Sequence, residues 1–568
     1  MIKSNHYQKI KMEKLLFCYL KAVPTFAKAA LTARVLICFA GMLISLHIHA
    51  QIHSSAVNAQ TLREHLTDNS SKPHSKTKLA TLKRFYSLRD YQPAWSESDQ
   101  LLARVDVALA FIGRADEEGL VVADYDFENL QQLRREKNNH ASLELELCVT
   151  QALLSLIRDV SSGRLQASAV DPDWHIAQPI FDSADFLQQA LMSDDLQQAL
   201  AGLAPNIPQY HALKKLLAKF RTLAASGEKW LPDPETDTPI RPNTTHSVIP
   251  LIRLRIEQVR TLFDNPDYAI SSSDSLFYDE TLENAIKAFQ RQHGLNADGV
   301  IGRHTRQAMN LLPQDYIQRL RINMERLRWL PRNLGNNYIL VNIAGFNLVA
   351  VKQGTPVLEM RIVVGQDYRS TPSFNSHISH IVLNPYWNVP DSIASKDLLP
   401  KQKHDPDFFA SQGIKVYADH THGFEIDPDM IDWQAIGKKL PYALRQTPGA
   451  KNALGRMKFM FSNPFSIYLH DTPSKSLFQR DIRTFSSGCI RLEKPMELAE
   501  FSLQQSMQKS SFQDKLNSGK SYTVHLPERL PIYIVYLTAW SDTQGDVRFS
   551  SDIYGRDKRA LTLARWLE

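Results

Sequence analysis

Two patterns of hydrophobic positions divide the chain. From about residue 81 to 248, apolar side chains recur at helical spacing, as in Leu101, Val105 and Leu109, and predict a helical scaffold domain. After residue 332 the pattern changes to short runs rich in β-branched residues, at 338–343, 347–351, 358–365 and 381–384. Such runs predict strands. The second pattern therefore indicates a β-rich domain over residues 333–530.

A small helical unit, residues 249–312, separates these two regions and leads into a connecting helix, 313–332. Asp279 is placed to cap a helix that Gly294 ends in a left-handed turn, and Thr305 to cap a second short helix. The arginines of the connecting helix predict a solvated face with Glu325 as a partner. The sequence thus predicts a compact three-helix unit followed by one amphipathic helix.

The strand pattern stops between about residues 391 and 455, where Lys, Asp, His, Pro and Gly are frequent and two helical runs occur. An insertion of this kind beside a site is a candidate lid. Its segment Asp419–His422 offers two histidines, but their spacing lacks partners for a metal site and favours a solvated loop. Strands resume at 458–461 and 466–470, a helix is expected at 496–508, and a closing β-hairpin and tail at 531–568.

The N-terminal 50 residues carry an export signal. Residues 1–34 hold seven Lys and Arg against one acid, and residues 35–46 are mostly apolar but too short to span a bilayer. Cleavage after Ala50 and retention as an inner-membrane anchor both stay open. A polar linker, 51–80, follows. The remaining chain has balanced charge, which argues against nucleic acid as a partner, and we expect it to lie in the periplasm with membrane contact only through the N-terminal segment.

Cysteine usage isolates one thiol. Cys18 and Cys38 lie in the targeting region, which leaves Cys148 and Cys489. A disulfide between these two is conceivable in an exported protein, but Cys148 lies in a helical run where a small buried hydrophobe fits better. Cys489 is then a free thiol within a polar Ser-Ser-Gly turn.

That turn carries the candidate chemistry. Cys489 would attack as a thiolate, and His470 is the base that could take its proton. Backbone N–H groups around Gly488 and the Tyr468 hydroxyl are candidate donors to an oxyanion. Arg491 would hold a substrate carboxylate or support the turn. The residue spacing alone leaves open the alternative of a buried cysteine and an unrelated histidine.

Two stretches resemble known families. Residues 288–302 (AFQRQHGLNADGVIG) resemble the FQ-x-x-HGL-x-x-DG-x-IG signature of the peptidoglycan-binding domain, although Phe289, Leu295 and Ile301 would be core residues in any case, so binding stays open. His470 and residues 486–491 (SSGCIR) resemble the H…S-x-G-C-x-R/N signature of the L,D-transpeptidase catalytic domain. Ser487 stands where many members have histidine. Residues 384–390, 444–455 and 469–473 also match the large, multidomain type of that family.

The resemblance implies a multidomain α+β protein: a helical scaffold domain, a small three-helix peptidoglycan-binding-like domain and a β-rich L,D-transpeptidase catalytic domain with a lid-like insertion. It implies that Cys489 and His470 are catalytic, that Tyr468, Ser487, Gly488 and Arg491 support the oxyanion or the turn, and that Trp387 and Asn388 contact substrate. No cofactor or metal is implied. The substrates would be diaminopimelate-containing tetrapeptide stems, which lose D-Ala and form 3–3 cross-links, and carbapenem β-lactams would acylate the cysteine. An L,D-carboxypeptidase, a D-amino acid exchange enzyme and a non-catalytic wall-binding scaffold remain alternatives.

Overall fold

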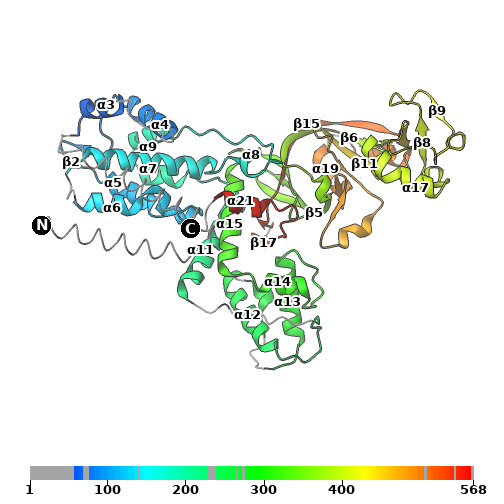
Figure 1. Cartoon of the computed structure of the whole chain (residues 1–568), viewed down its shortest axis with the longest axis horizontal. Helices are drawn as coiled ribbons and strands as arrows, with labels where there is room; N and C mark the ends of the chain where they lie inside the picture. The colour runs from blue at the N-terminus through cyan, green and yellow to red at the C-terminus, as the bar shows by residue number, and fades with distance from the viewer. Residues whose placement is uncertain are drawn as a thin grey trace, which may run out of the picture. The chain divides into compact units, whose positions relative to one another are not determined.

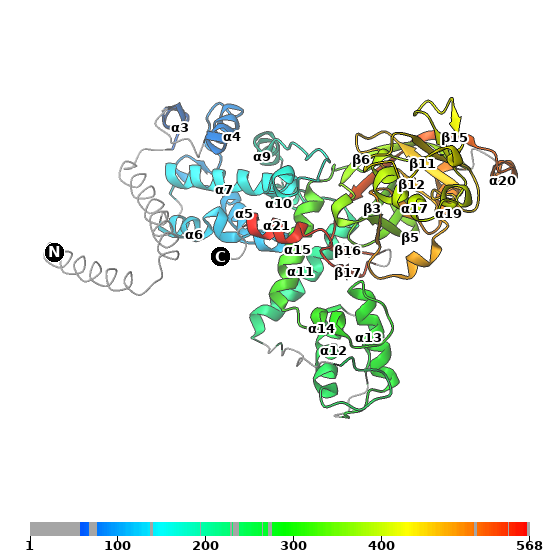
Figure 2. The same ribbon diagram turned by 45° about the vertical axis from the view of Figure 1, so that its right-hand side comes forward.

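The computed structural model describes residues 57–67, 76–136, 140–193, 195–227, 230, 238–263, 265–270, 275–504, 508–542 and 545–564 (Figures 1 and 2). The predicted export segment lies outside these residues. Within them, no helix combines the length and the apolar character needed to cross a membrane. The chain forms two compact units, of which the first comprises Met1–Ala110, Asp126–Leu154 and Ala184–Leu196, and the second comprises Phe111–Tyr125, Ser155–Ser183 and Gln197–Glu568.

The first unit is helical, as the apolar periodicity predicts. Its elements are α3 (Ala59–Thr67), α4 (Lys76–Ser87), α6 (Phe127–Glu136), α9 (Ser183–Met192), most of α5 (Arg104–Ile112), the first part of α7 (Leu143–Ser162) and the short pair β1 (Ser96–Glu97) and β2 (Gln100–Leu101). The buried Glu146 carboxylate accepts hydrogen bonds from Tyr86 Oη (2.8 Å) and from the N–H groups of Ala94 (2.5 Å) and Trp95 (3.1 Å). Burial raises the pKa of Glu146. This carboxylate therefore fixes the turn before β1 within the helical core.

The second unit contains several helices in addition to α15 (Pro313–Arg328). They are α8 (Ala167–Val170), α10 (Leu196–Ala201), α11 (Pro208–Ser226), α12 (Ile249–Phe263), α13 (Glu280–Gln292), α14 (Arg303–Met309) and α21 (Arg556–Ala564), with the 3₁₀ turns η2 (Ala115–Glu118), η3 (Val122–Tyr125) and η4 (Pro266–Tyr268). Helices α11 and α15 pack against each other, and Phe220 is stacked on Tyr316 with 4.6 Å between the ring centroids.

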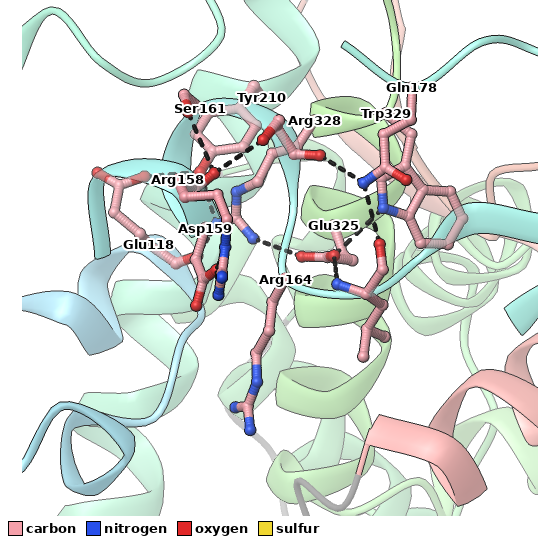
Figure 3. Close-up of polar contacts among 12 residues, drawn as sticks. Glu118, Arg158, Asp159, Ser161, Arg164, Gln178, Tyr210, Glu325, Arg328 and Trp329 are labelled. Carbon is pink, nitrogen blue, oxygen red and sulfur yellow. Dashed lines mark hydrogen bonds and ion pairs between the residues drawn. The ribbon is translucent and has the colours of Figure 1, made fainter. Parts of the chain in front are cut away.

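A buried polar network lies on α15 (Figure 3). Arg328 donates to Glu325 Oε2 (3.0 Å) and to the Tyr210 hydroxyl (2.8 Å), which in turn donates to Glu118 Oε2 (2.6 Å). The other oxygen of Glu325 accepts from the Leu165 N–H at 2.7 Å. Arg328 is 1 % exposed. The prediction of a solvated arginine face is therefore wrong here, whereas the predicted partnership with Glu325 is confirmed. A buried ion pair is stable when its members make further hydrogen bonds, and here both partners of Arg328 do so.

The small module formed by α12, α13 and α14 follows the predicted capping pattern at its centre. Asp279 caps α13 by accepting from the Leu282 N–H, and Gly294 takes the left-handed conformation (φ +66°) after it. Thr305 does not cap α14, because that helix begins at Arg303 with Gly302 before it. The Thr305 hydroxyl instead accepts from Gln290 Nε2 at 3.1 Å. Thr305 is thus part of the module's core.

A nine-stranded sheet forms the centre of the β-rich domain. Its strands are β3 (Asn337–Asn342), β4 (Asn347–Lys352), β5 (Thr355–Gly365), β6 (Phe374–Leu383), β11 (Met457–Phe461), β12 (Leu469–His470), β13 (Thr484–Ser486), β14 (Ile490–Leu492) and β15 (Tyr522–Val535). They follow the order β13-β5-β14-β12-β11-β6-β15-β3-β4, and an added β4–β5 pairing closes the sheet on itself. Strand β15 pairs along β6 and β3, so the expected boundary at residue 530 falls inside a strand of the main sheet.

The insertion has a sheet of its own, so the prediction that strands stop there is wrong. Strands β7 (Trp387–Asn388), β10 (Ala443–Gln446), β8 (Ile414–Tyr417) and β9 (Glu425–Ile426) form it, in that order. Helices α16 (Asp391–Ile393), η6 (Ala394–Leu398), α17 (Leu399–His404) and α18 (Phe408–Ser411), with the 3₁₀ turn η7 (Pro428–Met430), pack around a separate core that includes Phe409, Val416 and Leu444 (yellow in Figure 1). Strands of two to four residues are too short for their alternation to stand out from the sequence.

The chain closes with the predicted hairpin, β16 (Ala539–Ser541) and β17 (Val547–Phe549), and then α21. Before it lie η5 (Asp367–Arg369), η8 (Lys475–Gln479), α19 (Pro495–Leu503) and α20 (Lys509–Asn517). Helix α19 ends earlier than predicted, at Gln504, which takes a positive φ of 48°.

Candidate active site

Parallel pairing of β12 with β14 brings His470 and Cys489 together. The register joins Leu469 to Ile490 and His470 to Arg491. The Ile490 N–H also donates to the Tyr468 carbonyl at 3.1 Å. Cys489 directly precedes β14 and therefore lies beside Tyr468, at the end of the strand that carries His470. The sheet thus spans the separation in sequence that residue spacing alone left open.

The turn before Cys489 is held by its own hydroxyl groups. Ser486 Oγ donates to the Cys489 carbonyl (2.5 Å) and accepts from the Gly488 N–H (3.1 Å). Gly488 has a φ of +113°, a conformation that side chains rarely adopt. Its N–H is engaged within the turn, so Gly488 shapes the backbone and the Cys489 N–H is the backbone donor left for an oxyanion. No described hydrogen bond uses the Cys489 N–H.

The Cys489 thiol is protonated at rest. Burial raises its pKa, although the Tyr468 N–H and hydroxyl and the positive charges of Lys458 and Arg491 act in the opposite direction. Its Sγ lies 3.8 Å from the Ser466 carbonyl oxygen, which can only accept. A thiol hydrogen directed at that oxygen must leave before the sulfur can attack.

His470 is neutral and has a fixed tautomer. Burial, followed by the positive charge of Arg491, lowers its pKa to about 3. Its Nδ1 lies 2.5 Å from the Asp471 carbonyl oxygen, so Nδ1 carries the hydrogen and Nε2 keeps its lone pair. Among the described residues no hydrogen bond joins His470 to Cys489. The imidazole is therefore an unprotonated base, and it does not form an ion pair with the thiol in this structure.

Tyr468 links this centre to the insertion. Burial and the nearby sulfur raise the pKa of its hydroxyl, while a hydrogen bond from the Trp387 indole lowers it. Trp387 begins the insertion's sheet and lies beside Tyr468, and its predicted contact with substrate stays a prediction. Asn388, the next residue, is exposed and pairs along β10 with Arg445. Its role as a substrate contact stays a prediction.

Lys458 is a site residue that the sequence analysis missed. It lies opposite His470 in the β11–β12 pair, and its Nζ is 3.8 Å from the centroid of the Tyr468 ring. Burial lowers the pKa of Lys458, and the electrostatic interaction with the Cys489 sulfur acts to raise it. The sequence feature that could have identified it is the presence of a lysine within an otherwise apolar strand. Arg491 is also largely buried, and its Nε has no hydrogen-bond partner.

Ser487 is joined to the insertion through a single arginine. Arg369 Nη1 donates to Ser487 Oγ (2.8 Å) and to Asp397 Oδ2 (2.6 Å). Asp397 belongs to η6 of the insertion. Arg369 therefore bridges the predicted supporting residue and the insertion, and neither Arg369 nor Asp397 carried a sequence signal.

The back of the turn rests on a loop from the strand β5–β6 connection. Thr371 Oγ1 donates to the Gly488 carbonyl at 2.8 Å and accepts from the Gly365 N–H at 3.0 Å. Gly365 approaches so closely that a Cβ there would lie 2.1 Å from the Arg369 carbonyl oxygen. The position of Cys489 thus depends on packing behind it.

A buried arginine from the C-terminal helix fastens that loop to a distant segment. Arg556 donates to the Thr371 carbonyl (3.1 Å) and pairs with Asp171 (3.4 Å) and Asp173 (2.9 Å). The Ser373 N–H donates to the Asp173 carbonyl at 2.8 Å. Three stretches far apart in sequence therefore meet behind the catalytic turn.

The remaining sequence candidates have plain environments. Cys148 and Cys489 are both free thiols, so the disulfide alternative is not formed. His420 Nε2 lies 3.1 Å from Asp391 Oδ1 on an exposed loop. Within the described ranges, no group of three or more His, Cys, Asp or Glu could hold a metal ion.

A thiol with two hydroxyl or amide donors, beside a neutral imidazole on the neighbouring strand, is an arrangement suited to acyl transfer. Family models match three parts of the chain: the scaffold domain at residues 80–217, the "Putative peptidoglycan binding domain" at 263–309 and the L,D-transpeptidase catalytic domain at 336–512. The chain therefore carries matches to scaffold, peptidoglycan-binding and L,D-transpeptidase catalytic domains, and the catalytic match falls in the β-rich region after the helical one.

A protein of Haemophilus influenzae described as a "Putative L,D-transpeptidase" is 37% identical over 243 residues, which are 43% of this chain and 48% of that protein. The chain thus spans about half the length of this curated relative. The crystal structure of an L,D-transpeptidase from Xylanimonas cellulosilytica matches with 14% identity and a TM-score of 0.18, over 53% of this chain and all of that one.

Proposed function

We propose that this protein is a cysteine-dependent L,D-transpeptidase of the periplasm that cross-links peptidoglycan. The observation that carries the proposal is the pairing of β12 with β14, which sets His470 and Cys489 on adjoining strands within a domain matched by the L,D-transpeptidase model. The peptidoglycan-binding domain match supports the same polymer as substrate.

In the proposed first step, His470 Nε2 takes the thiol proton and Cys489 Sγ attacks the carbonyl carbon of the L,D peptide bond after the third residue of a tetrapeptide stem. The Cys489 N–H and the Tyr468 hydroxyl stabilise the oxyanion. The carbon–nitrogen bond then breaks, the imidazolium returns its proton to the amine of the leaving D-Ala, and a thioester remains on Cys489.

In the second step the diaminopimelate amine of another stem attacks the thioester, loses a proton to His470 and yields a 3–3 cross-link with a free thiol. A β-lactam of the carbapenem class would acylate the same sulfur. The N-terminal segment would export the chain, either as a cleaved signal or as an anchor in the inner membrane.

The test uses purified protein with a disaccharide-tetrapeptide, and mass spectrometry of the products. Release of D-Ala together with a cross-linked dimer is expected. D-Ala without a dimer would replace the proposal with an L,D-carboxypeptidase, and incorporation of added D-amino acid would replace it with an exchange enzyme. If wild type and Cys489→Ala both leave the substrate unchanged, the non-catalytic scaffold is the correct assignment.

A further inference from the structure

A large cavity lies away from Cys489. It has a volume of about 1070 Å³, and its lining residues include neither Cys489 nor His470. One wall comes from the small helical module, through residues 291–297 and α14. The other comes from the sheet domain, through residues 342–347, 359–361 and 478–483. We call this cavity the module groove.

Buried residues hold the helical module against α15 and the β16–β17 hairpin, so the module groove has a defined shape. Gln292 Nε2 donates to the Val547 carbonyl at 3.0 Å, and the His293 ring lies 2.8 Å from the Tyr316 hydroxyl and stacks on Phe549. Burial lowers the pKa of His293 to about 3, so this contact stays neutral at physiological pH. The signature residues Gln292 and His293 thus hold the module in place, and other side chains face the cavity.

Positive charge predominates in the module groove. Seven Arg and Lys residues line it against three acids, Glu359, Asp481 and Glu493. Ion pairs already engage three of the cations: Arg291 with Asp267, Arg361 with Glu493 and Arg548 with Asp542. Four cations have no described ion pair, namely Arg319, Arg480, Arg483 and Lys494.

The surroundings of Arg483 indicate the charge of a ligand that would fit the module groove. Its guanidinium donates to the carbonyls of Arg480 (2.6 Å), Ile362 (3.1 Å) and Phe346 (3.2 Å), which hold it in place without neutralising it. Burial and the charge of Arg361 lower its pKa to about 10, so it remains a cation at neutral pH. Glu493 and Asp481 act on Arg483 from nearby, but neither forms a described ion pair with it, and a fixed cation among further cations favours an anionic ligand.

We propose that the module groove binds peptidoglycan through the carboxylates of uncleaved peptide stems, at a site separate from the one that performs the chemistry. The inference rests on the proposed function for the identity of the polymer. Stem carboxylates would face Arg480, Arg483 and Lys494 on the sheet-domain wall. Glycan hydroxyls and peptide amides would meet the polar side chains Asn296 and Gln307 on the module wall. The volume slightly exceeds the roughly 300–1,000 Å³ of small-molecule sites and suits a segment of polymer.

Sedimentation with purified peptidoglycan sacculi tests this proposal on the full chain. We expect Arg480→Gln/Lys494→Gln to weaken binding about tenfold, since it removes two exposed cations from the wall that faces the stem carboxylates. Sacculi stripped of stems by an amidase should bind wild type as weakly as intact sacculi bind the variant. Arg529→Gln, an exposed cation on β15 outside the groove, is the matched control and should bind like wild type. Lys494→Gln alone serves if the double variant fails to melt like wild type.

Equal binding of wild type and the groove variants would overturn the proposal, as would equal binding of stripped and intact sacculi. Stronger competition by a polyphosphate or nucleic acid than by soluble stem peptides would assign the groove to another ligand class and also overturn it. Cys489→Ala should bind sacculi normally. Wild-type protein that binds sacculi but releases no D-Ala would contradict the proposed function, whereas wild-type protein that releases D-Ala but binds stripped and intact sacculi equally would contradict only this inference.

Discussion

The contact between the insertion and the catalytic turn makes a sharp kinetic prediction. Arg369 Nη1 binds Ser487 Oγ at 2.8 Å and Asp397 Oδ2 at 2.6 Å, and its side chain is 16% exposed against 38% for Asp397. Hydrogen bonds to charged groups contribute about 1.5–3 kcal/mol when buried. Because Asp397 is more than a third exposed, solvent screening reduces its share to about 1 kcal/mol.

Asp397→Asn keeps the shape and removes the charge, so we expect kcat/KM for D-Ala release to fall about fivefold. Arg369→Gln loses both charge-assisted contacts and should cost about 2–3 kcal/mol, or 30- to 150-fold. A double variant should resemble Arg369→Gln alone, because the aspartate acts only through the arginine. Glu425→Gln is the matched control, since Glu425 forms an exposed pair with Lys415 (2.9 Å) elsewhere in the insertion.

The reasoning fails if Asp397→Asn and Glu425→Gln have the same kcat/KM. It also fails if the effects of Asp397→Asn and Arg369→Gln add in the double variant, because additivity would mean that the aspartate acts independently of the arginine. The kinetics are measured well below the lowest melting temperature of the set, so that a loss of stability common to all variants does not affect kcat/KM.

Three further predictions concern the turn and the module. Iodoacetamide should alkylate Cys489 with a midpoint above pH 9.0, the value of an ordinary thiol, because burial raises its pKa; a midpoint below pH 8 would contradict this. Thr371→Val removes the hydroxyl that bridges Gly365 and Gly488, and should lower the free energy of unfolding by about 1–3 kcal/mol and slow acylation; Thr371→Ser should restore both, and failure of that rescue would count against the bridge. Asp279→Ala should lower the unfolding free energy by about 1 kcal/mol in urea titration at pH 7. The pKa of Asp279 is lowered to about 2 from 3.8, so its contribution is complete above pH 4 and is lost as pH falls toward 2; a wild-type-to-variant difference that persists below pH 2 would refute the assignment.

Local sequence patterns predicted the parts of the fold that local interactions determine. The cap at Asp279, the left-handed Gly294, the hairpin β16–β17 and the strands β3, β4 and β11 are properties of a few neighbouring residues. The insertion's sheet was not predicted because its strands have only two to four residues. Strands this short are stabilised by partners across the sheet rather than by a periodic pattern of their own.

The supporting residues of the site could not be predicted for a different reason. Arg369 and Ser487 are 118 residues apart, and Arg556 and Asp171 are 385 apart. No periodicity or spacing links such pairs, because only the folded sheet brings them within hydrogen-bond distance. The candidate catalytic pair could be predicted because chemistry restricts its residue types, whereas the residues that position it are ordinary arginines and aspartates.

The peptidoglycan-binding signature illustrates the difference between a recognisable motif and a binding surface. Gln290 donates to Asp298 and Val300 and accepts from the Gly299 N–H, so it builds the turn that closes the module. His293 is buried against Tyr316. Residues that make a motif recognisable are here the ones that the fold requires. A ligand can contact only what the fold leaves exposed, and these positions are freer to differ between copies of the module. We therefore expect polymer binding by this copy to depend on the cations that the sheet domain contributes to the module groove, and not on the strength of the match to the signature.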